Sequence, residues 1–196
     1  MRIPRYLFYG TFLLIVLILL FMYLNAKSDT SDIMKEMQKS NRYIDELRLL
    51  TGIGTLSSAH IHADIAIFVE GTKMDLSKPQ YQLRASSVHL EEDNGEVIHV
   101  HADGITIGNF LNSIGMHITA ECLTLDNGKE LCSKDDKTLK FFVNGEENED
   151  YGSYVIRDID KILISYGNEP FPSVEKQLKA VTDLAKTKSG KSMALG

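Results

Sequence analysis

Several residue types and motifs that define specialised proteins are scarce or absent in this chain of 196 residues. Its two cysteines are too few for a disulfide-rich mini-protein, a zinc ribbon or an iron–sulfur centre. Four prolines and fourteen glycines exclude a collagen-like or proline-rich protein. The phosphate-binding patterns GxxxxGK[ST] and GxGxxG, the zinc-protease motif HExxH and the nucleophile elbow GxSxG are all missing. What remains is a chain of globular composition, with 43% hydrophobic and 24% charged residues.

The N-terminal region holds one long apolar run. Residues 7–24 carry no charge and, as a helix, span about 27 Å, close to the hydrocarbon thickness of a bilayer. Arg2 and Arg5 precede the run and only Lys27 follows closely, so the positive-inside rule places the N-terminus in the cytoplasm. A cleaved signal peptide is the alternative, but the run is longer than a usual signal core and residues 24–26 (Leu-Asn-Ala) make a poor cleavage site. We therefore expect a single-pass plasma-membrane anchor that contacts the lipid bilayer through 7–24, with the main domain on the extracytoplasmic side.

Charge is distributed unevenly along the rest of the chain. The net charge is −6, but residues 60–172 contain 20 acidic and 9 basic residues and therefore carry −11. An acidic body repels nucleic acid and attracts cations. The composition excludes a nucleic-acid partner and disfavours a phosphate ligand.

Hydrophobic periodicity divides the chain into four parts: an anchor over 1–24, a membrane-proximal stalk helix and linker over 25–59, a β-rich domain over 60–172, and an amphipathic C-terminal helix and tail over 173–196. The stalk helix is expected over 31–50, with Ile33, Met37, Ile44 and Leu47 at helical spacing. The stalk or the C-terminal helix is a candidate surface for a membrane-protein partner.

The domain pattern predicts an α+β fold, compact and β-rich, with one or two packed helices. Strands are expected over 60–69, 97–102, 139–144, 154–156 and 161–166, because apolar residues alternate or run continuously there. A helix is expected after Thr106, whose side chain caps it, with Gly115 at its C-terminal end. Ser173 is expected to cap the C-terminal helix.

The two cysteines flank a sequence that is symmetric about Asn127. A three-residue loop over 126–128 pairs Leu125 with Lys129, and counting outward places Cys122 opposite Cys132. Cross-strand neighbours are close enough for a disulfide, which would persist outside the cytoplasm. The alternatives are two unpaired thiols or a redox-active pair, although the CxxC spacing of thioredoxin-like proteins is absent.

All six histidines fall within residues 60–117, and four of them form two HxH pairs. Residues i and i+2 of a strand point to the same side, so each pair presents two imidazoles from one face. Two such strands side by side would bring four imidazoles together, a donor set that suits copper or zinc. The predicted ligands are His60, His62, His99 and His101, followed by His89. Asp64, Asp103 and Glu96 are predicted to orient these ligands or to add oxygen donors.

Three other interpretations of these residues stay open. The histidines could be solvated or hydrogen-bonded without a metal, or could form a pH-responsive cluster; His117, beyond the predicted helix, is expected to lie outside any site. The domain could be a non-catalytic interaction module or an accessory subunit of a membrane complex. A metallohydrolase would need a general base, for which Glu91, Glu92 or Glu96 is available, but no motif selects one. An enzyme is therefore the less favoured interpretation, and metal handling or sensing the favoured one.

Two stretches of the chain resemble known groups of proteins. Residues 141–167 resemble the closing half of β-grasp proteins such as the small sulfur carriers, without the Gly-Gly end that carrier chemistry requires. Residues 60–167, with HIHAD, VIHVHADGITIGNF, the cysteine hairpin and FFVNG…DKILISYG, resemble an uncharacterised group of membrane-anchored exported proteins, mostly archaeal. That resemblance implies an extracytoplasmic location and no established activity. The HxH spacing is also similar to that of cupins, whose later glutamate and PxG element are missing here.

Overall fold

The structure is a computed structural model that describes residues 5–193. The chain divides after Thr51 into an N-terminal unit, which is a single helix, and a compact unit that begins at Gly52. Arg2 of the predicted basic flank and residues 194–196 of the predicted tail lie outside the described residues.

The N-terminal unit is one continuous helix, α1 (Arg5–Thr51), of 47 residues. Residues 31–50 are helical as expected, but they do not form a separate helix, because α1 passes through residues 25–30 without interruption. Within the helix, Thr30 donates its hydroxyl to the carbonyl of Ala26. By length and composition α1 is able to cross a membrane, and its large apolar side chains from Phe12 onward are exposed.

The compact unit is α+β and contains a mixed sheet. Within residues 5–193 this sheet has seven strands in the order β3-β4-β1-β10-β8-β9, with β2 also paired to β1. The strands are β1 (Ile61–Val69), β2 (Thr72–Lys73), β3 (Val88–His89), β4 (Val97–Val100), β8 (Thr138–Val143), β9 (Glu146–Glu147) and β10 (Lys161–Gly167). The central strands β1 and β10 are parallel, and every other neighbouring pair in this sheet is antiparallel.

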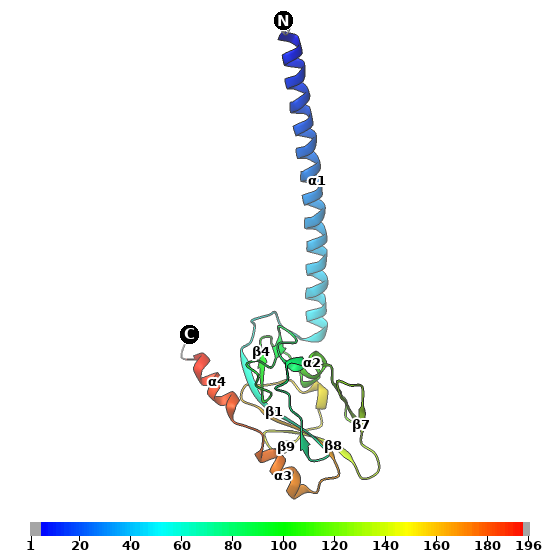
Figure 1. The fold of residues 1–196 in the computed structure, drawn as a ribbon, viewed down its shortest axis with the longest axis vertical. Coiled ribbons are helices and arrows are strands. Elements are labelled where there is room, and N and C mark those ends of the chain that lie inside the picture. The colour runs from blue at the N-terminus through cyan, green and yellow to red at the C-terminus, as the bar shows by residue number, and fades with distance from the viewer. Residues whose placement is uncertain (1–4, 194–196) are drawn as a thin grey trace. The chain divides into compact units, whose positions relative to one another are not determined.

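A second, three-stranded sheet and several short helices complete the unit. The small sheet has the order β5-β6-β7. Its strands are β5 (His117–Ile118), β6 (Cys122–Thr124) and β7 (Glu130–Cys132), and the helical elements are η1 (Pro79–Tyr81), α2 (Ile107–Ser113), η2 (Tyr151–Ser153), α3 (Phe171–Lys179) and α4 (Leu184–Met193). Helix α4 lies on one side of the large sheet, and α2 with the β6–β7 hairpin lies on the other (Figure 1).

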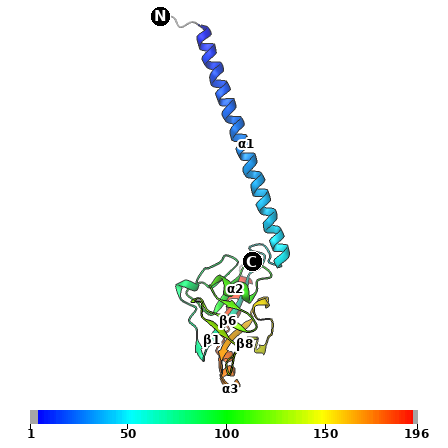
Figure 2. The ribbon, with the colours of Figure 1, turned by 90° about the vertical axis from the view of Figure 1, so that its right-hand side faces the viewer.

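The two faces of the large sheet bury different sets of side chains. Ala63, Ile65 and Ile67 of β1 enter the main core, where they pack with α2 residues such as Phe110. The alternate β1 residues Ala66 and Phe68 belong to a smaller apolar cluster that includes α3. The view in Figure 2 shows α2 and β6 in front of the large sheet. Because alternate side chains of a strand point to opposite faces, β1 is buried on both sides.

The sequence pattern misplaced two elements. Residues 154–156 follow the 3₁₀ turn η2 and form only an isolated bridge, Thr106 to Val155, instead of the predicted strand. The buried carboxylate of Asp160 accepts hydrogen bonds from the hydroxyl of Tyr154 and the backbone of Arg157, which holds this segment in a turn. The single helix expected from Ser173 is two helices, and the first begins at Phe171 after Pro170.

The predicted hairpin and its disulfide are confirmed. Cys122 pairs with Cys132 across β6 and β7, and the two sulfurs are bonded, with Cα atoms 4.0 Å apart. The bond closes a loop with a sequence separation of 10 residues. Leu123, the middle residue of β6, is fully buried in the main core, so the small sheet is part of that core.

We expect the double substitution Cys122→Ser/Cys132→Ser to lower the free energy of unfolding by about 2–3 kcal/mol, the loop-closure entropy of a loop of this length. Urea unfolding of the full chain in detergent measures the loss. Reductant should destabilise the wild type by a similar amount and leave the double variant unchanged. Equal stability of oxidised and reduced wild type would contradict the prediction.

Candidate metal centre

Three adjacent strands carry histidines in one row across the large sheet. His62 of β1 is directly opposite His99 of β4, and His99 is directly opposite His89 of β3. His60 and His101 come two residues away from His62 and His99 along the chain, so they form a second row on the same side of the sheet. The strand pairing therefore brings together all five histidines that the sequence predicts.

The five imidazoles form a closed ring, which we call the histidine ring: His60, His62, His99, His89, His101 and back to His60. Successive ring centroids are 5.0, 4.7, 5.9, 5.0 and 5.3 Å apart. The ring ranges from buried to exposed, since His62 and His99 are each only 3% exposed whereas His60 is exposed.

The ring spacing can be compared with that of imidazoles on one ion. A metal–nitrogen bond of about 2.0–2.1 Å places a ring centre about 3.2 Å from the ion, so two imidazoles on a tetrahedral ion have centres about 5 Å apart. The separations in the histidine ring match this value. Among the described residues, however, no group of three or more His, Cys, Asp or Glu side chains has its donor atoms already placed around one point. Side-chain rotation would be needed to gather three ligands.

His62 is held by a hydrogen-bonded chain that includes helix α4. Its Nδ1 lies 3.1 Å from Oγ of Ser189, and that hydroxyl donates to Oδ1 of Asp158 at 2.8 Å. The same Asp158 oxygen accepts the backbone N–H of His62 at 3.0 Å. Since the Ser189 proton is used on Asp158, the hydroxyl accepts from Nδ1–H of His62, which leaves Nε2 as the nitrogen with a free lone pair.

His89 and His99 are oriented in a similar way. Nδ1 of His89 lies 2.8 Å from the carbonyl oxygen of Ala85, which can only accept a hydrogen bond. Nδ1 of His99 lies 3.4 Å from Oε1 of Glu91. Nε2 of His99 is buried and has no hydrogen-bond partner in the described part of the chain. An unpartnered buried nitrogen is costly, and a bound cation is one way of satisfying it.

Burial favours the neutral, metal-binding form of several of these imidazoles. It lowers the pKa of His99 to about 4, although the carboxylate of Glu91 acts in the opposite direction. Burial also lowers the pKa of His62 and of His101, and a neighbouring imidazole adds to the effect in each case. Because only neutral imidazole binds metal, these shifts extend the pH range in which ligands are available.

The three carboxylates predicted to support the ligands have other contacts. Asp64 lies on the same side of β1 as His62, but its carboxylate binds the start of α4. Glu96 forms an ion pair with Lys73. Asp103 is exposed, and its backbone bonds with Gly54 and Ser58.

No hydrogen bond or ion pair between described residues connects these three carboxylates to the histidine ring. The prediction that they orient the ligands or add oxygen donors stays a prediction. The side chains that contact the imidazoles in this structure are those of Glu91, Ser189 and, through Ser189, Asp158.

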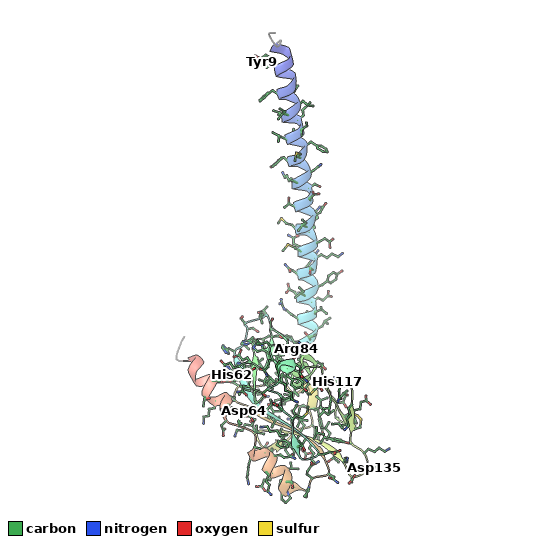
Figure 3. The ribbon with its side chains drawn as sticks, in the orientation of Figure 1. Tyr9, His62, Asp64, Arg84, His117 and Asp135 are labelled. Carbon is green, nitrogen blue, oxygen red and sulfur yellow. A yellow bond between two sulfur atoms is a disulfide. The ribbon has the colours of Figure 1, made fainter. Side chains whose placement is uncertain are left out.

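The sixth histidine lies outside the ring, as expected. His117 is exposed on β5, with Nδ1 3.1 Å from the side-chain oxygen of Asn112. Figure 3 shows His117 well apart from His62 and Asp64. It provides a matched control for substitutions in the ring.

The ring is covered on one side and open on another. Helix α4 covers the ring at His62, and Lys188 of α4 forms an ion pair with Glu92 at 2.6 Å. His89 and His101 line an open hollow of about 490 Å³ together with Arg84 and Ser86. The hollow gives solvent, and therefore an ion, access to the ring.

Comparison of the chain with protein-family models, with curated proteins and with solved structures found no match. Function is therefore inferred from the geometry of the site and from the sequence pattern.

Proposed function

We propose that this chain is a membrane-anchored domain on the extracytoplasmic side that binds a divalent transition-metal ion, copper or zinc, to handle or sense it. The observation that carries the proposal is the histidine ring, in which five imidazoles from three strands have centroids 4.7–5.9 Å apart. Two of these rings, His62 and His89, have Nδ1 at hydrogen-bond distance from a protein oxygen, and Nδ1 of His99 lies 3.4 Å from the carboxylate of Glu91. That arrangement is typical of metal-ligating histidines.

The proposed location depends on two features outside the histidine ring. Helix α1 is long and apolar enough to span a bilayer, and Arg2 and Arg5 precede its apolar run. The disulfide between Cys122 and Cys132 is stable in an oxidising compartment and rare in a reducing one. Both features favour a cytoplasmic N-terminus and a domain outside the plasma membrane.

Elemental analysis of the untagged full chain, purified in detergent, tests the proposal. We expect about one equivalent of zinc or copper per chain, and near-complete loss in a variant with His60, His62, His99 and His101 all changed to alanine. His117→Ala should retain the wild-type metal content, because this imidazole lies outside the ring. Wild-type protein that binds neither ion when each is added to it would overturn the proposal.

We also propose that the domain has the β-grasp topology. In that topology, two antiparallel strands are followed by a helix, two further strands and a final strand that is parallel to the first. The elements β1, β4, α2, β8, β9 and β10 follow this order along the chain. That residues 60–167 resemble exported, mostly archaeal proteins is likewise a proposal. An experimental structure would decide the topology.

A second candidate function, docking to a membrane-protein partner, is favoured by one observation on α1. Ile33, Met37, Ile44 and Leu47 are 42–60% exposed and recur at spacings of three, four and seven residues. Helices α3 and α4 pack Val174 and Ala185 on their own domain and each exposes one large apolar residue, Phe171 or Leu184, whereas the stalk part of α1 exposes a row of them. Co-purification of a membrane protein, lost in Ile44→Glu and insensitive to chelator, would support this function.

A further inference from the structure

Glu91 lies beside the histidine ring in a position that the sequence motifs do not indicate. It follows His89 by two residues, with the fully buried Leu90 between them. One carboxylate oxygen, Oε2, is 3.4 Å from Nε2 of His89, and the other, Oε1, is 3.4 Å from Nδ1 of His99. The carboxylate therefore bridges two imidazoles whose planes are nearly parallel, at 10°.

The contact between His89 and Glu91 is unusual because the proton of the His89 imidazole is on Nδ1, the nitrogen that does not face Glu91. The carbonyl oxygen of Ala85 accepts from Nδ1–H of His89, so the neutral imidazole has only a lone pair at Nε2. Nε2 lies 3.4 Å from the carboxylate oxygen Oε2, and two acceptors at that distance repel each other. A cation between them converts the repulsion into attraction.

The distance of this contact fits a metal ion. Bonds of about 2.0–2.2 Å from a tetrahedral ion to a histidine nitrogen and a carboxylate oxygen place these two atoms about 3.3–3.5 Å apart. The observed 3.4 Å between Nε2 and Oε2 lies within that range. His101 can supply an additional imidazole, since its ring centroid is 5.0 Å from that of His89.

We infer that Glu91 is itself a metal ligand, and that its Oε2 pairs with Nε2 of His89 at a site open to the hollow beside His101. The inference rests on the proposed function and deepens it by naming the ligand chemistry. A carboxylate is a hard, anionic donor, so a mixed carboxylate–imidazole set selects a divalent ion over Cu(I), which prefers soft sulfur ligands. Oε1 of the same carboxylate orients His99 through Nδ1.

The test compares Glu91→Gln with the wild type in the full chain, using Zn(II) competition against a chromophoric chelator and the visible spectrum of bound Co(II). We expect the substitution to weaken Zn(II) binding about ten-fold or more and to shift the Co(II) absorption bands, because one oxygen ligand is lost. Glu96→Gln is the matched control, since Glu96 pairs with Lys73 and should leave both measurements unchanged.

The outcomes separate the two proposals. If the wild type binds Zn(II) and Glu91→Gln binds it with the same affinity and the same Co(II) spectrum, the inference about Glu91 is overturned and the histidine site stands. If the wild type binds neither Zn(II) nor Co(II), the proposed function fails and this inference with it. Weaker Zn(II) binding with an unchanged Co(II) spectrum would also overturn the ligand role, because a group that acts only through neighbouring residues leaves the ligand set intact.

Discussion

Replacing Asp64 with alanine should lower the free energy of unfolding by about 3–4 kcal/mol and detach α4 from the sheet. Asp64 is 1% exposed, and its carboxylate accepts hydrogen bonds from the hydroxyl of Thr182 and the backbone N–H groups of Leu184 and Ala185. Removing an ionised acceptor leaves these buried donors unsatisfied, and bonds to charged groups are worth more than neutral ones. The loss therefore exceeds that of an ordinary helix cap.

Two measurements on the full chain in detergent check this expectation: urea unfolding and limited tryptic cleavage at Lys186 and Lys188 of α4. Asp64→Ala should expose both sites to trypsin. Asp183→Ala is the control in the same segment, because Asp183 is exposed and its ion pair with Lys161 is worth less than about 1 kcal/mol. A loss below about 1 kcal/mol in Asp64→Ala, with both lysines still protected, would contradict the assigned role of Asp64.

The position of Asp64 connects the stability of the C-terminal helix to the histidine ring. The carboxylate holds the first turn of α4, and Ser189 in the middle of that helix orients His62. A variant that detaches α4 therefore loses the Ser189–Asp158 chain behind His62 as well. We infer that α4 belongs structurally to the candidate metal centre.

The local part of the site can be predicted from the sequence, because strand geometry is local. The alternation of side chains along a strand is enough to place His60 with His62, and His99 with His101, on one face each. It also places Asp64 correctly on the face of His62. The partner of Asp64 could not be predicted, because the residues it binds are about 120 positions further along the chain.

The non-local part of the site depends on pairing that no motif encodes. The register that sets His99 opposite both His62 and His89 requires β4 to pair with β1 on one side and with β3 on the other. Ser189 comes from the last helix of the domain and Asp158 from the turn before β10, and neither is close to a histidine in the sequence. The disulfide is predictable by contrast, because a hairpin symmetric about Asn127 fixes its own register.

The fold shows the same division between local and distant information. The cap and periodicity after Thr106 predict a helix, and the structure has both the helix and a full capping box with Asn109. The continuity of α1 is not predictable in this way, because polar residues near Thr30 favour a cap locally while a long helix tolerates them. Local helix propensity predicts a helix boundary poorly where a longer helix continues through the same residues.

Acidification should destabilise the metal-free domain, with about 3 kcal/mol of the loss between pH 7 and pH 4 coming from His99. The pKa of this imidazole is about 4 in the folded protein, because burial opposes the charged form, against an ordinary value near 6.5. The unfolded chain therefore binds a proton as the pH falls below about 6.5, while folded His99 stays neutral until about pH 4. His99 therefore does not reduce the free energy of unfolding above about pH 6.5. The domain loses stability as the pH falls from about 6.5 to about 4, because the unfolded chain alone gains the proton.

The groups that face His99 explain why its shift is large. Glu91 favours the charged imidazole, but the neighbouring His62, His89 and Lys188 oppose it and add to the effect of burial.

Urea unfolding of the full chain in detergent with chelator, at pH 7, 5.5 and 4, measures the dependence of stability on pH. His99→Leu should have a flatter profile than the wild type by about 3 kcal/mol over this range, whereas His117→Leu should keep the wild-type profile. Parallel profiles of His99→Leu and wild type would show that the pKa of His99 is the same in the folded and the unfolded chain, and would contradict the prediction.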